Sequence, residues 1–518
     1  MANARIVWVD DEMESLKSQK LFLEQKGYEV ITFTNGFDAI EYIKENKPDV
    51  VLLDESMPGI SGLETLAAIK AVHQSLPAVL VTKNETENLM EEAIGSQIAD
   101  YLIKPVNPNQ VLLSLKKILD NKRLVAEKTT SAYQMEFRSL FMALSDNQDA
   151  SGWQEIYKKL VYWELEMEKS RSPEMMEILQ SQKQEANTAF FKFISKNYTG
   201  WIQAGSGRRP ILSPDLMKER VVPLLEPEIP VFFILIDNLR FDQWKMIQPL
   251  FEEDFNMIRE DTYYSILPTA TQYCRNAVFA GMMPLEIADK FPQQWKNDEE
   301  EGGKNLHEEA FLASFIKKMQ KKDIRYSYTK VVGNQDAQQL VSGIHNLLIN
   351  DLNVIVYNFV DMLSHARTEM EVLKELAGDE QGYRSITKSW FEHSPLRQAL
   401  KKIADRKIKL VISTDHGSVQ VKTPFKVIGD KQTTSNLRYK HGKNLNYNAK
   451  DVLAFKNPKE GGLPLPHVNS SFIFAKEDGF LCYPNNYNYY VNYYKNTFQH
   501  GGVSMEEMII PIIQMESK

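Results

Sequence analysis

Charged side chains follow short apolar runs in the first 120 residues. Asp10 and Asp11 follow one such run, Asp54 follows a second, and Lys104 follows a third. Three clustered carboxylates repel one another, and a hard divalent cation such as Mg²⁺ relieves that repulsion. The cation leaves one carboxylate free to attack a phosphoryl phosphorus, while Lys104 pairs with the added phosphate. Thr82, after a further apolar run, offers the new oxygens a hydroxyl, so these residue types predict a carboxylate that accepts a phosphoryl group.

A second set of reactive side chains lies beside apolar runs beyond residue 226. Each alone is ordinary, because Asp often caps a helix and a lone His is usually structural. Together, they are expected to place three aspartates and three histidines at strand ends of one sheet. Six such groups suit two divalent ions, and the mixture of imidazole and carboxylate favours Zn²⁺ over Mg²⁺. These residues are Asp237, Asp361, His365, Asp415, His416 and His500.

A metal-dependent hydrolase also needs a nucleophile, and the segment 267–276 contains two threonines, Thr269 and Thr271. The helical pattern that follows would place one of them at a helix N-terminus, where backbone N–H groups face a phosphate. Metal coordination lowers the pKa of a hydroxyl and makes it a usable nucleophile. The residue types therefore favour an enzyme over a coincidental array.

The first set needs a framework of alternating strands and helices. Amphipathic helical patterns separate five apolar strand candidates. Five such βα units predict a doubly wound parallel sheet covered on both faces, with reactive groups at the carboxyl ends of its strands. The strand candidates are 5–9, 29–33, 50–53, 78–81 and 101–103.

The rest of the chain divides into two parts with different sequence patterns. Residues 122–225 carry helical patterns and predict a helical bundle, interpreted as a rigid connector or, alternatively, as a docking or dimerisation surface. Residues 226–518 again contain apolar strands, predicting an α/β domain with long insertions. Its strand candidates are 231–236, 353–359, 408–413, 470–474 and 508–513. We therefore expect three domains, at 1–121, 122–225 and 226–518.

Composition restricts the class of protein. The 518 residues are 43% hydrophobic and 25% charged, which are globular values. The apolar runs are too short to span a membrane, and two cysteines fit a reducing cytoplasm. The first 120 residues contribute the whole net charge of −8, because acidic and basic residues are equal in number in the rest of the chain. This distribution argues against specific binding of duplex DNA.

The first motifs jointly resemble the receiver domain of response regulators, which has a CheY-like fold. They are Asp-Asp, Asp-x-x-Met-Pro-Gly, Thr and Lys-Pro, each after the appropriate strand. The resemblance implies phosphorylation by a cognate histidine kinase and dimerisation of the phosphorylated protein. The implied roles are phosphoacceptor for Asp54, Mg²⁺ ligands for Asp10, Asp11 and Asp54, and switch or phosphate contacts for Thr82, Lys104 and Tyr101.

The second set resembles the PglZ branch of the alkaline phosphatase superfamily. The resemblance implies two Zn²⁺ ions per chain, and it favours Thr271 because phosphodiesterase relatives use the second threonine of Pro-Thr-x-Thr. Sulfatase chemistry is not expected, since the segment around Cys274 lacks the sulfatase proline. One implied ion is held by Asp361, His365 and His500, and the other by Asp237, Thr271, Asp415 and His416.

The order of the three parts resembles response regulators of the PorX type. This implies a zinc-dependent phosphodiesterase acting on oligonucleotides, including cyclic ones, and a role in type IX secretion and gliding. It also implies contacts with a sigma factor and a secretion-motor protein. Arg240, Arg275 and Asn276 are candidates for binding the anionic substrate, and Arg240 is alternatively a brace for Asp237. The competing interpretations are a non-catalytic, metal-stabilised interaction scaffold and a phosphomonoesterase.

Overall fold

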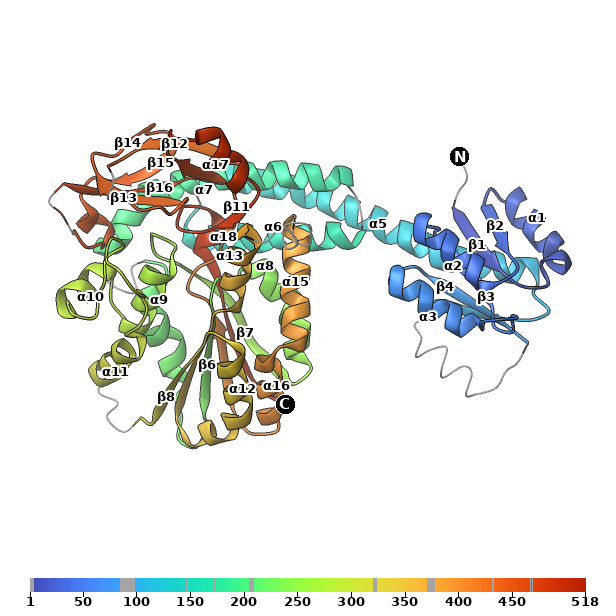
Figure 1. The fold of residues 1–518 in the computed structure, drawn as a ribbon, viewed down its shortest axis with the longest axis horizontal. Helices are drawn as coiled ribbons and strands as arrows, with labels where there is room; N and C mark the ends of the chain where they lie inside the picture. The colour runs from blue at the N-terminus through green and yellow to red at the C-terminus, as the bar shows by residue number, and fades with distance from the viewer. Residues whose placement is uncertain are drawn as a thin grey trace. The chain divides into compact units, whose positions relative to one another are not determined.

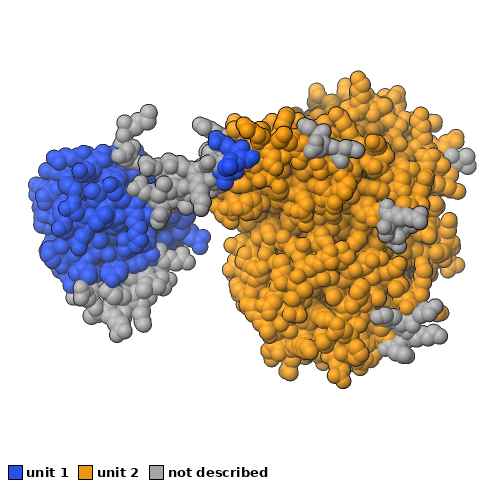
Figure 2. Space-filling model, turned by 180° about the vertical axis from the view of Figure 1, so that it is seen from behind, with its two compact units in different colours: residues 1–135, 170–172 blue, residues 136–169, 173–518 orange. Residues whose placement is uncertain are grey.

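The structure is a computed structural model, and its chain forms two compact units (Figure 2). One unit comprises residues 1–135 with 170–172, and the other comprises 136–169 with 173–518. Side chains at 120–131, 145, 173–174 and 365–369 lie outside the description. Described are residues 4–83, 98–145, 148–170, 173–204, 209–319, 324–369, 378–430, 433–465, 467 and 469–518.

The first unit contains a five-stranded parallel sheet in the order β2-β1-β3-β4-β5. This order confirms the predicted doubly wound α/β fold. Buried residues on both faces of the sheet form two apolar clusters, as expected for a sheet covered on both sides. The strands are β1 (Arg5–Val9), β2 (Glu29–Phe33), β3 (Val50–Asp54), β4 (Ala78–Thr82) and β5 (Asp100–Ile103).

Two helices of this unit begin at residues whose side chains cap them. The Asn35 side chain accepts from Asp38 N at the start of α2 (Gly36–Glu45). Ser61 and Glu64 form a reciprocal capping box at the start of α3 (Gly62–Val72). The remaining helical elements are η1 (Met13–Leu16), α1 (Lys17–Gln25) and α5 (Pro108–Ser145).

The second unit is built on a six-stranded mixed sheet in the order β7-β19-β10-β6-β9-β8 (Figure 1). Strands β10, β6, β9 and β8 are parallel, so their carboxyl ends share one edge. Strand β19 runs antiparallel to β10, and therefore begins at that same edge. The strands are β6 (Val231–Ile236), β7 (Phe255–Tyr264), β8 (Tyr326–Val331), β9 (Leu352–Tyr357), β10 (Lys409–Ser413) and β19 (Ile509–Ser517).

Helices cover this sheet. Helix α8 packs with α15, α9 with α11, and α12 with α16. The covering helices are α8 (Phe241–Glu252), α9 (Thr271–Ala280), α10 (Pro284–Lys290), α11 (Glu308–Lys318), α12 (Asn334–Gly343), α13 (Phe359–Glu369), α15 (Glu380–His393) and α16 (Pro395–Ile403). Within the described residues, no helix has the length and apolar character needed to cross a membrane.

Most of the predicted helical segment, residues 136–169 and 173–225, belongs to the same unit as this α/β core and packs on it. It contains α6 (Ala150–Ser170) and α7 (Pro173–Gln203). Trp153 of α6 contacts Phe190 of α7 edge to face, and Phe190 stacks on Tyr264 at the end of β7. Gln154 donates a hydrogen bond to the Thr262 carbonyl, 2.7 Å away. Short 3₁₀ and π turns over 213–224 lead from these helices into β6.

Residues 417–503 form small sheets at one end of the unit (orange to red in Figure 1). They include the helix α17 (Tyr487–Tyr494), and the four-residue α18 (Met505–Met508) leads from them into β19. The short strands are β11 (Val419–Gln420), β12 (Thr423–Ile428), β13 (Tyr439–Lys443), β14 (Asn446–Tyr447), β15 (Val452–Phe455), β16 (Ser470–Ala475), β17 (Gly479–Cys482) and β18 (Phe498–Gln499).

Candidate functional site

The candidate phosphoacceptor lies at the carboxyl edge of the first sheet. Ligand oxygens of Asp10, Asp11 and Asp54 all lie within 4.8 Å of one another. Lys104 Nζ lies 2.8 Å from Asp10 Oδ2 and 3.0 Å from Asp54 Oδ1. The parallel strands β1, β3 and β5 bring these four side chains together, because their carboxyl ends share one edge.

The surroundings of this cluster set its charge. Burial raises the pKa of Asp54, and Asp10 adds to the rise against the opposing ammonium of Lys104. Burial alone would lower the pKa of Lys104, but its hydrogen bonds to both carboxylates outweigh burial and raise it. Thr82 is buried at the end of β4, while Tyr101 on β5 is 45% exposed. The segment 84–97, between β4 and β5, lies outside the described residues.

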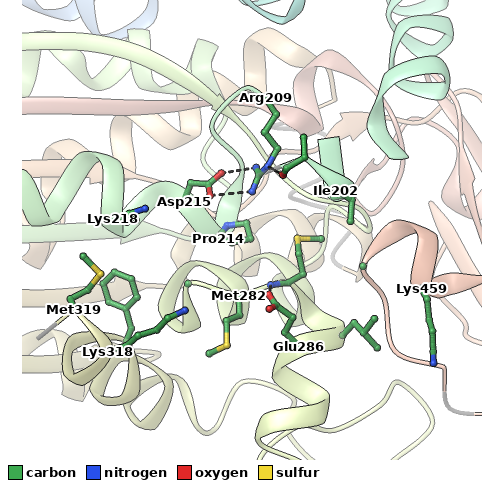
Figure 3. Close-up of a pocket in the computed structure, with 16 residues that line it drawn as sticks. Ile202, Arg209, Pro214, Asp215, Lys218, Met282, Glu286, Lys318, Met319 and Lys459 are labelled. Atoms are coloured by element: carbon green, nitrogen blue, oxygen red, sulfur yellow. Dashed lines mark hydrogen bonds and ion pairs between the residues drawn. The ribbon is translucent and has the colours of Figure 1, made fainter. Parts of the chain in front are cut away.

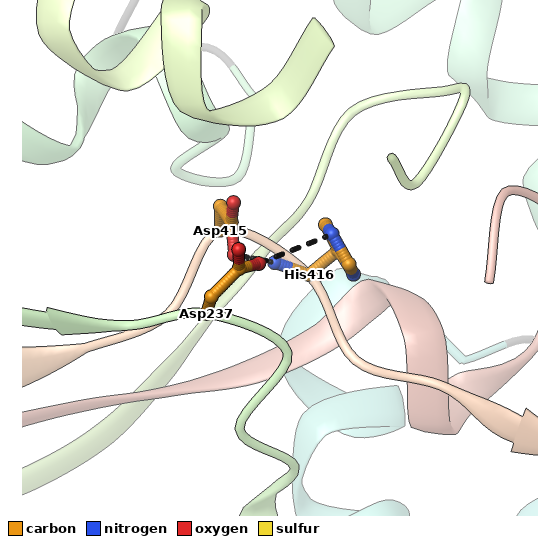
Figure 4. A group of neighbouring side chains, drawn as sticks. All are labelled: Asp237, Asp415 and His416. Carbon is orange, nitrogen blue, oxygen red and sulfur yellow. Dashed lines mark hydrogen bonds and ion pairs between the residues drawn. The ribbon is translucent and has the colours of Figure 1, made fainter. Parts of the chain in front are cut away.

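A second cluster lies at the carboxyl edge of the six-stranded sheet. Asp237 follows β6, and Asp415 and His416 follow the adjacent strand β10. Their ligand atoms lie within 4.8 Å of one another, and all three residues are buried (Figure 4). Two carboxylates and one imidazole are donors that zinc prefers.

Thr271 is the first residue of α9 and faces this cluster. Its Oγ1 lies 2.9 Å from His416 Nε2 and 3.4 Å from Asp237 Oδ1. Thr269 points elsewhere: its hydroxyl donates to the Gly502 carbonyl, 3.0 Å away. Of the two threonines, Thr271 is the one within reach of the predicted metal ligands.

His500 and Asp361 lie beside the second cluster. His500 Nε2 is 3.6 Å from Asp361 Oδ1. The rings of His500 and His416 stack with centroids 4.2 Å apart, so the two predicted ligand sets are adjacent. Asp361 lies in the first turn of α13, because β9 ends at Tyr357 rather than continuing to Phe359 as predicted. His365 is on the same helix, and its side chain is outside the described residues.

The placement of His500 corrects one expectation. The sequence predicts all six groups at strand ends of one sheet, but His500 follows β18, which pairs with β11 instead. His500 still reaches the site because it lies in the segment before β19, and the antiparallel β19 begins at the edge where β10 ends.

Backbone carbonyls fix the orientation of both imidazoles. His416 Nδ1 lies 3.1 Å from the Gly417 carbonyl oxygen, and His500 Nδ1 lies 3.1 Å from that of Thr269. A carbonyl only accepts, so each Nδ1 carries a proton, and in the neutral ring the lone pair is then on Nε2. This is how metal-ligating histidines are usually held. The residues present therefore fit zinc in donor type and in orientation.

Arg275 lies inside the site, four residues after Thr271. Its guanidinium lies 2.9 Å from Asp237 Oδ2, 3.4 Å from Asp415 Oδ2 and 3.0 Å from Glu308 Oε1. It is buried, and it also donates to Asn358 Oδ1. Arg275 therefore braces two candidate metal ligands, which is a more specific placement than the general substrate contact expected from the sequence.

The two aspartates beside Arg275 are held differently. Burial raises the pKa of Asp237 well above its ordinary value, and the nearby Asp415 and Asp361 carboxylates add to the rise. Burial alone would raise the pKa of Asp415 as well, but His416 and Arg275 outweigh it and lower that pKa. A cation between the carboxylates would relieve the crowding around Asp237.

Arg240 does not brace Asp237, and that prediction is wrong. Arg240 is buried; it donates from Nε to Asp242 Oδ1 over 2.9 Å and pairs with Glu380. Its guanidinium also lies 5.1 Å from the Phe498 ring centroid. The chain turns at Asn238, which has a φ of 62°, and Arg240 is thereby placed beside other carboxylates.

Asn276 is buried, and its side chain forms hydrogen bonds with nearby residues of the same chain. Its amide donates to the Lys304 carbonyl over 3.2 Å and accepts from Asn305 over 3.1 Å. Asn305 in turn donates to the Thr271 carbonyl, 3.2 Å away. Asn276 thus supports the start of α9 through the insertion that contains Asn305.

Sequence reasoning missed two buried carboxylates of this region. Glu308 pairs with Arg275, and Glu507 lies 3.5 Å from the Thr269 hydroxyl. Neither follows a strand or belongs to a motif, so no local signal marks them. Their partners lie far away in the chain, and only the fold brings the pairs together.

A separate hollow of about 620 Å³ lies at the other end of α9 (Figure 3). Gly281 and Met282, which follow that helix, line it together with Phe315, Met319 and Lys318. The candidate metal ligands and Thr271 are not among its lining residues. This hollow is therefore distinct from the site at the sheet edge.

Three family models match successive parts of the chain. The response regulator receiver domain matches residues 6–116, and the PorX response regulator linker domain matches 123–202. The BREX system PglZ alkaline phosphatase-like domain matches 216–515, which is more than half of the chain.

Similar proteins share a smaller part of the chain. The phosphoglycerate transport system transcriptional regulatory protein PgtA of Salmonella typhimurium is 32% identical over 120 residues, covering 23% of this chain and 29% of that protein. The transcriptional regulatory protein ZraR of Klebsiella oxytoca is 33% identical over 132 residues, covering 26% of this chain and 30% of that protein. The chain thus spans less than a third of the length of these two relatives.

Solved structures match a similar share. The CheY-like response regulator receiver domain protein from Methanospirillum hungatei JF-1 is 28% identical, with a TM-score of 0.22, covering 23% of this chain and 94% of that one.

The order of the family models shows to which family the chain belongs. A receiver domain, a PorX linker domain and a PglZ alkaline phosphatase-like domain follow one another, so the chain belongs to the PorX-type response regulators.

Proposed function

We propose that this response regulator is a zinc-dependent phosphodiesterase whose nucleophile is Thr271 and whose input is phosphorylation of Asp54. The observation that carries the proposal is the position of the Thr271 hydroxyl, 2.9 Å from His416 Nε2 and beside Asp237. A scaffold that used metal only for stability would have no need of a hydroxyl at this point. The alkaline phosphatase-like family supports hydrolysis.

In the proposed reaction, Thr271 Oγ1 attacks phosphorus and the leaving alcohol departs on the opposite side. Water then hydrolyses the phosphothreonine and restores the hydroxyl. Thr271 begins α9, so backbone N–H groups of the first turn face the oxygens of a phosphoryl group on Oγ1. Zinc, when bound, supplies Lewis-acid charge that lowers the hydroxyl pKa and offsets negative charge on phosphorus oxygens.

The proposed ions are two per chain. Asp237, Asp415, His416 and Thr271 would hold one, while Asp361, His365 and His500 would hold the other. In the receiver, Asp10, Asp11 and Asp54 would hold Mg²⁺. The proposed substrates are oligonucleotides, including cyclic ones, following the family resemblance. Arg275 then acts by holding Asp237 and Asp415 in place, and not by reaching substrate.

The proposed setting also follows the family. A cognate histidine kinase in the cytoplasm would phosphorylate Asp54, and the phosphorylated chain would form a homodimer. A sigma factor and a type IX secretion motor protein are the proposed partners. The two cysteines, Cys274 and Cys482, are free and buried, which agrees with a reducing compartment.

The test compares wild type, Thr271→Ala and Thr271→Ser on bis- and mono-p-nitrophenyl phosphate, with zinc measured in the same samples. We expect Thr271→Ala to lower diester kcat/KM by at least about a thousandfold, as loss of a nucleophile does. Thr271→Ser retains a hydroxyl and should retain measurable turnover. Wild-type protein that carries two zinc ions but hydrolyses neither ester nor an oligonucleotide would support the scaffold instead. Preference for the monoester would support a phosphomonoesterase.

A further inference from the structure

The loop that carries His500 is clamped by Thr269, a buried residue outside the candidate metal ligands. The Thr269 carbonyl accepts from His500 Nδ1 over 3.1 Å. The Thr269 hydroxyl accepts from Gly501 N over 2.9 Å and donates to the Gly502 carbonyl over 3.0 Å. One residue thus holds the histidine ring and a backbone group of each of the two residues that follow it.

The two glycines allow this close clamp. Gly501 has a φ of 123°, a conformation that side chains disfavour. A Cβ on Gly502 would lie 2.6 Å from the Ala475 carbonyl oxygen. The backbone after His500 therefore passes very close to its neighbours, and small changes in Thr269 would be transmitted to the ring.

Glu507 holds the other side of the same loop. Its carboxylate accepts from Gly502 N over 2.9 Å, and it pairs with Arg438 over 2.6 Å. Its carbonyl accepts from Gly417 N, the residue after His416, over 3.1 Å. Glu507 is buried and thereby connects the loops of both candidate metal-binding histidines.

We infer that Thr269 and Glu507 are positioning residues that fix His500 relative to His416. They thereby govern binding of the second zinc ion, the one proposed to be held by His500 and two residues of α13. This role rests on the proposed function, because it assumes that His500 is a zinc ligand. It assigns no contact with substrate to either residue. The hydroxyl of Thr269, and not its bulk, is the part that acts, since it satisfies two buried backbone groups of the His500 loop.

The variant Thr269→Val tests this role, because valine keeps the shape and the carbonyl but removes the hydroxyl. Thr269→Ser is the matched control, since it keeps the hydroxyl. Zinc binding is titrated against a competing chelator, and the two dissociation constants are compared with those of wild type. We expect Thr269→Val to weaken one ion by about 10- to 100-fold, the range for loss of a group that orients a ligand, and to leave the other unchanged. Thr269→Ser should stay within a few-fold of wild type.

Several results would overturn the role. A Thr269→Val protein that binds both zinc ions with wild-type dissociation constants would do so. So would a variant in which the binding of both ions is weakened equally. If Thr269→Val does not fold by circular dichroism, Thr269→Ala replaces it, because alanine also removes the hydroxyl that bonds Gly501 N and the Gly502 carbonyl. An unchanged dissociation constant for both zinc ions in a folded Thr269→Ala variant then contradicts the role. Failure of the proposed activity is detected separately, by measuring the turnover of the wild-type protein. A wild-type protein that binds only one zinc ion contradicts both the proposed function and the positioning role.

Discussion

Arg275 and Arg240 are both buried near Asp237, yet they hold different carboxylates. Arg275 binds Asp237 and Asp415, whereas Arg240 binds Asp242 and Glu380. The sequence identified both as basic groups near the site but could not assign the pairs. A buried guanidinium pairs with whichever carboxylates the fold places beside it, and here those lie up to 140 residues away.

His441 makes the stability of the second unit depend on pH. Its ring is buried and stacks on Phe472, with centroids 4.4 Å apart. Burial lowers the pKa of His441 from 6.5 to about 4, and Glu299 only partly opposes this. Unfolding therefore takes up a proton between pH 6.5 and 4. The stability that the neutral ring contributes is fully present above pH 6.5 and is lost as the pH falls towards 4.

We therefore expect His441→Gln to flatten the fall in the free energy of unfolding between pH 6.5 and 4. The slope should decrease by up to about 1.4 kcal/mol per pH unit, the value for one proton. Urea unfolding at a series of pH values measures it. The exposed His393 provides the control variant His393→Gln, which should keep the wild-type slope. Equal slopes for His441→Gln and wild type would contradict the assignment.

At the scale of elements, the bounds of β1, β2 and β6 agree with the predictions. Strand β6 is buried along its whole length and β1 along most of it, because continuous apolar runs mark buried parallel strands, whereas β2 is mostly half-buried. The edge strands β7 and β8 were missed. Exposed and half-exposed residues dominate β8 and much of β7, so neither contains an uninterrupted apolar run. Asp361 was predicted beside a strand and lies on a helix, since β9 ends two residues early.

The turn after β10 leaves no room for a side chain at Gly417. A Cβ there would lie 2.0 Å from the Glu506 carbonyl oxygen, a backbone atom that cannot rotate away. We expect Gly417→Ala to displace His416, to lower zinc content, and to destabilise the protein by about 1–3 kcal/mol. Elemental analysis and urea unfolding measure the two effects.

Gly343, at the end of α12, is the matched control, because a Cβ there would meet nothing within 4 Å. Gly343→Ala should keep its zinc and be as stable as wild type or slightly more stable. A Gly417→Ala protein with full zinc content and wild-type stability would show that the turn can relax.

At the scale of the whole molecule, the connector helices α6 and α7 pack as part of the second unit, which contains the candidate metal ligands. Tyr198 on α7 accepts from Leu267 N over 2.8 Å, in the segment that leads to Thr271. Asn187, also on α7, accepts from Met505 N over 2.8 Å, in the segment that follows His500. The sequence predicted these helices from their periodicity. It could not predict what they pack against, because periodicity marks a buried face without naming its partner.

The receiver domain leads to a prediction about dimerisation of the whole chain. If phosphorylated Asp54 drives dimerisation, acetyl phosphate with Mg²⁺ should about double the mass of wild type in light scattering, and Asp54→Ala should remain unchanged. Glu41→Ala, which removes an exposed carboxylate on α2, is the control and should behave as wild type. A mass that responds equally in wild type and Asp54→Ala would contradict this coupling.

The proton positions on His416 and His500 are set by carbonyls of the main chain. Every amino acid has a carbonyl, so no single substitution at Thr269 or Gly417 can delete the acceptor itself. A substitution at either position can therefore change the tautomer only by moving the backbone. A tautomer held in this way leaves no trace in a comparison of side chains, and relatives with different residues here would protonate the same nitrogen.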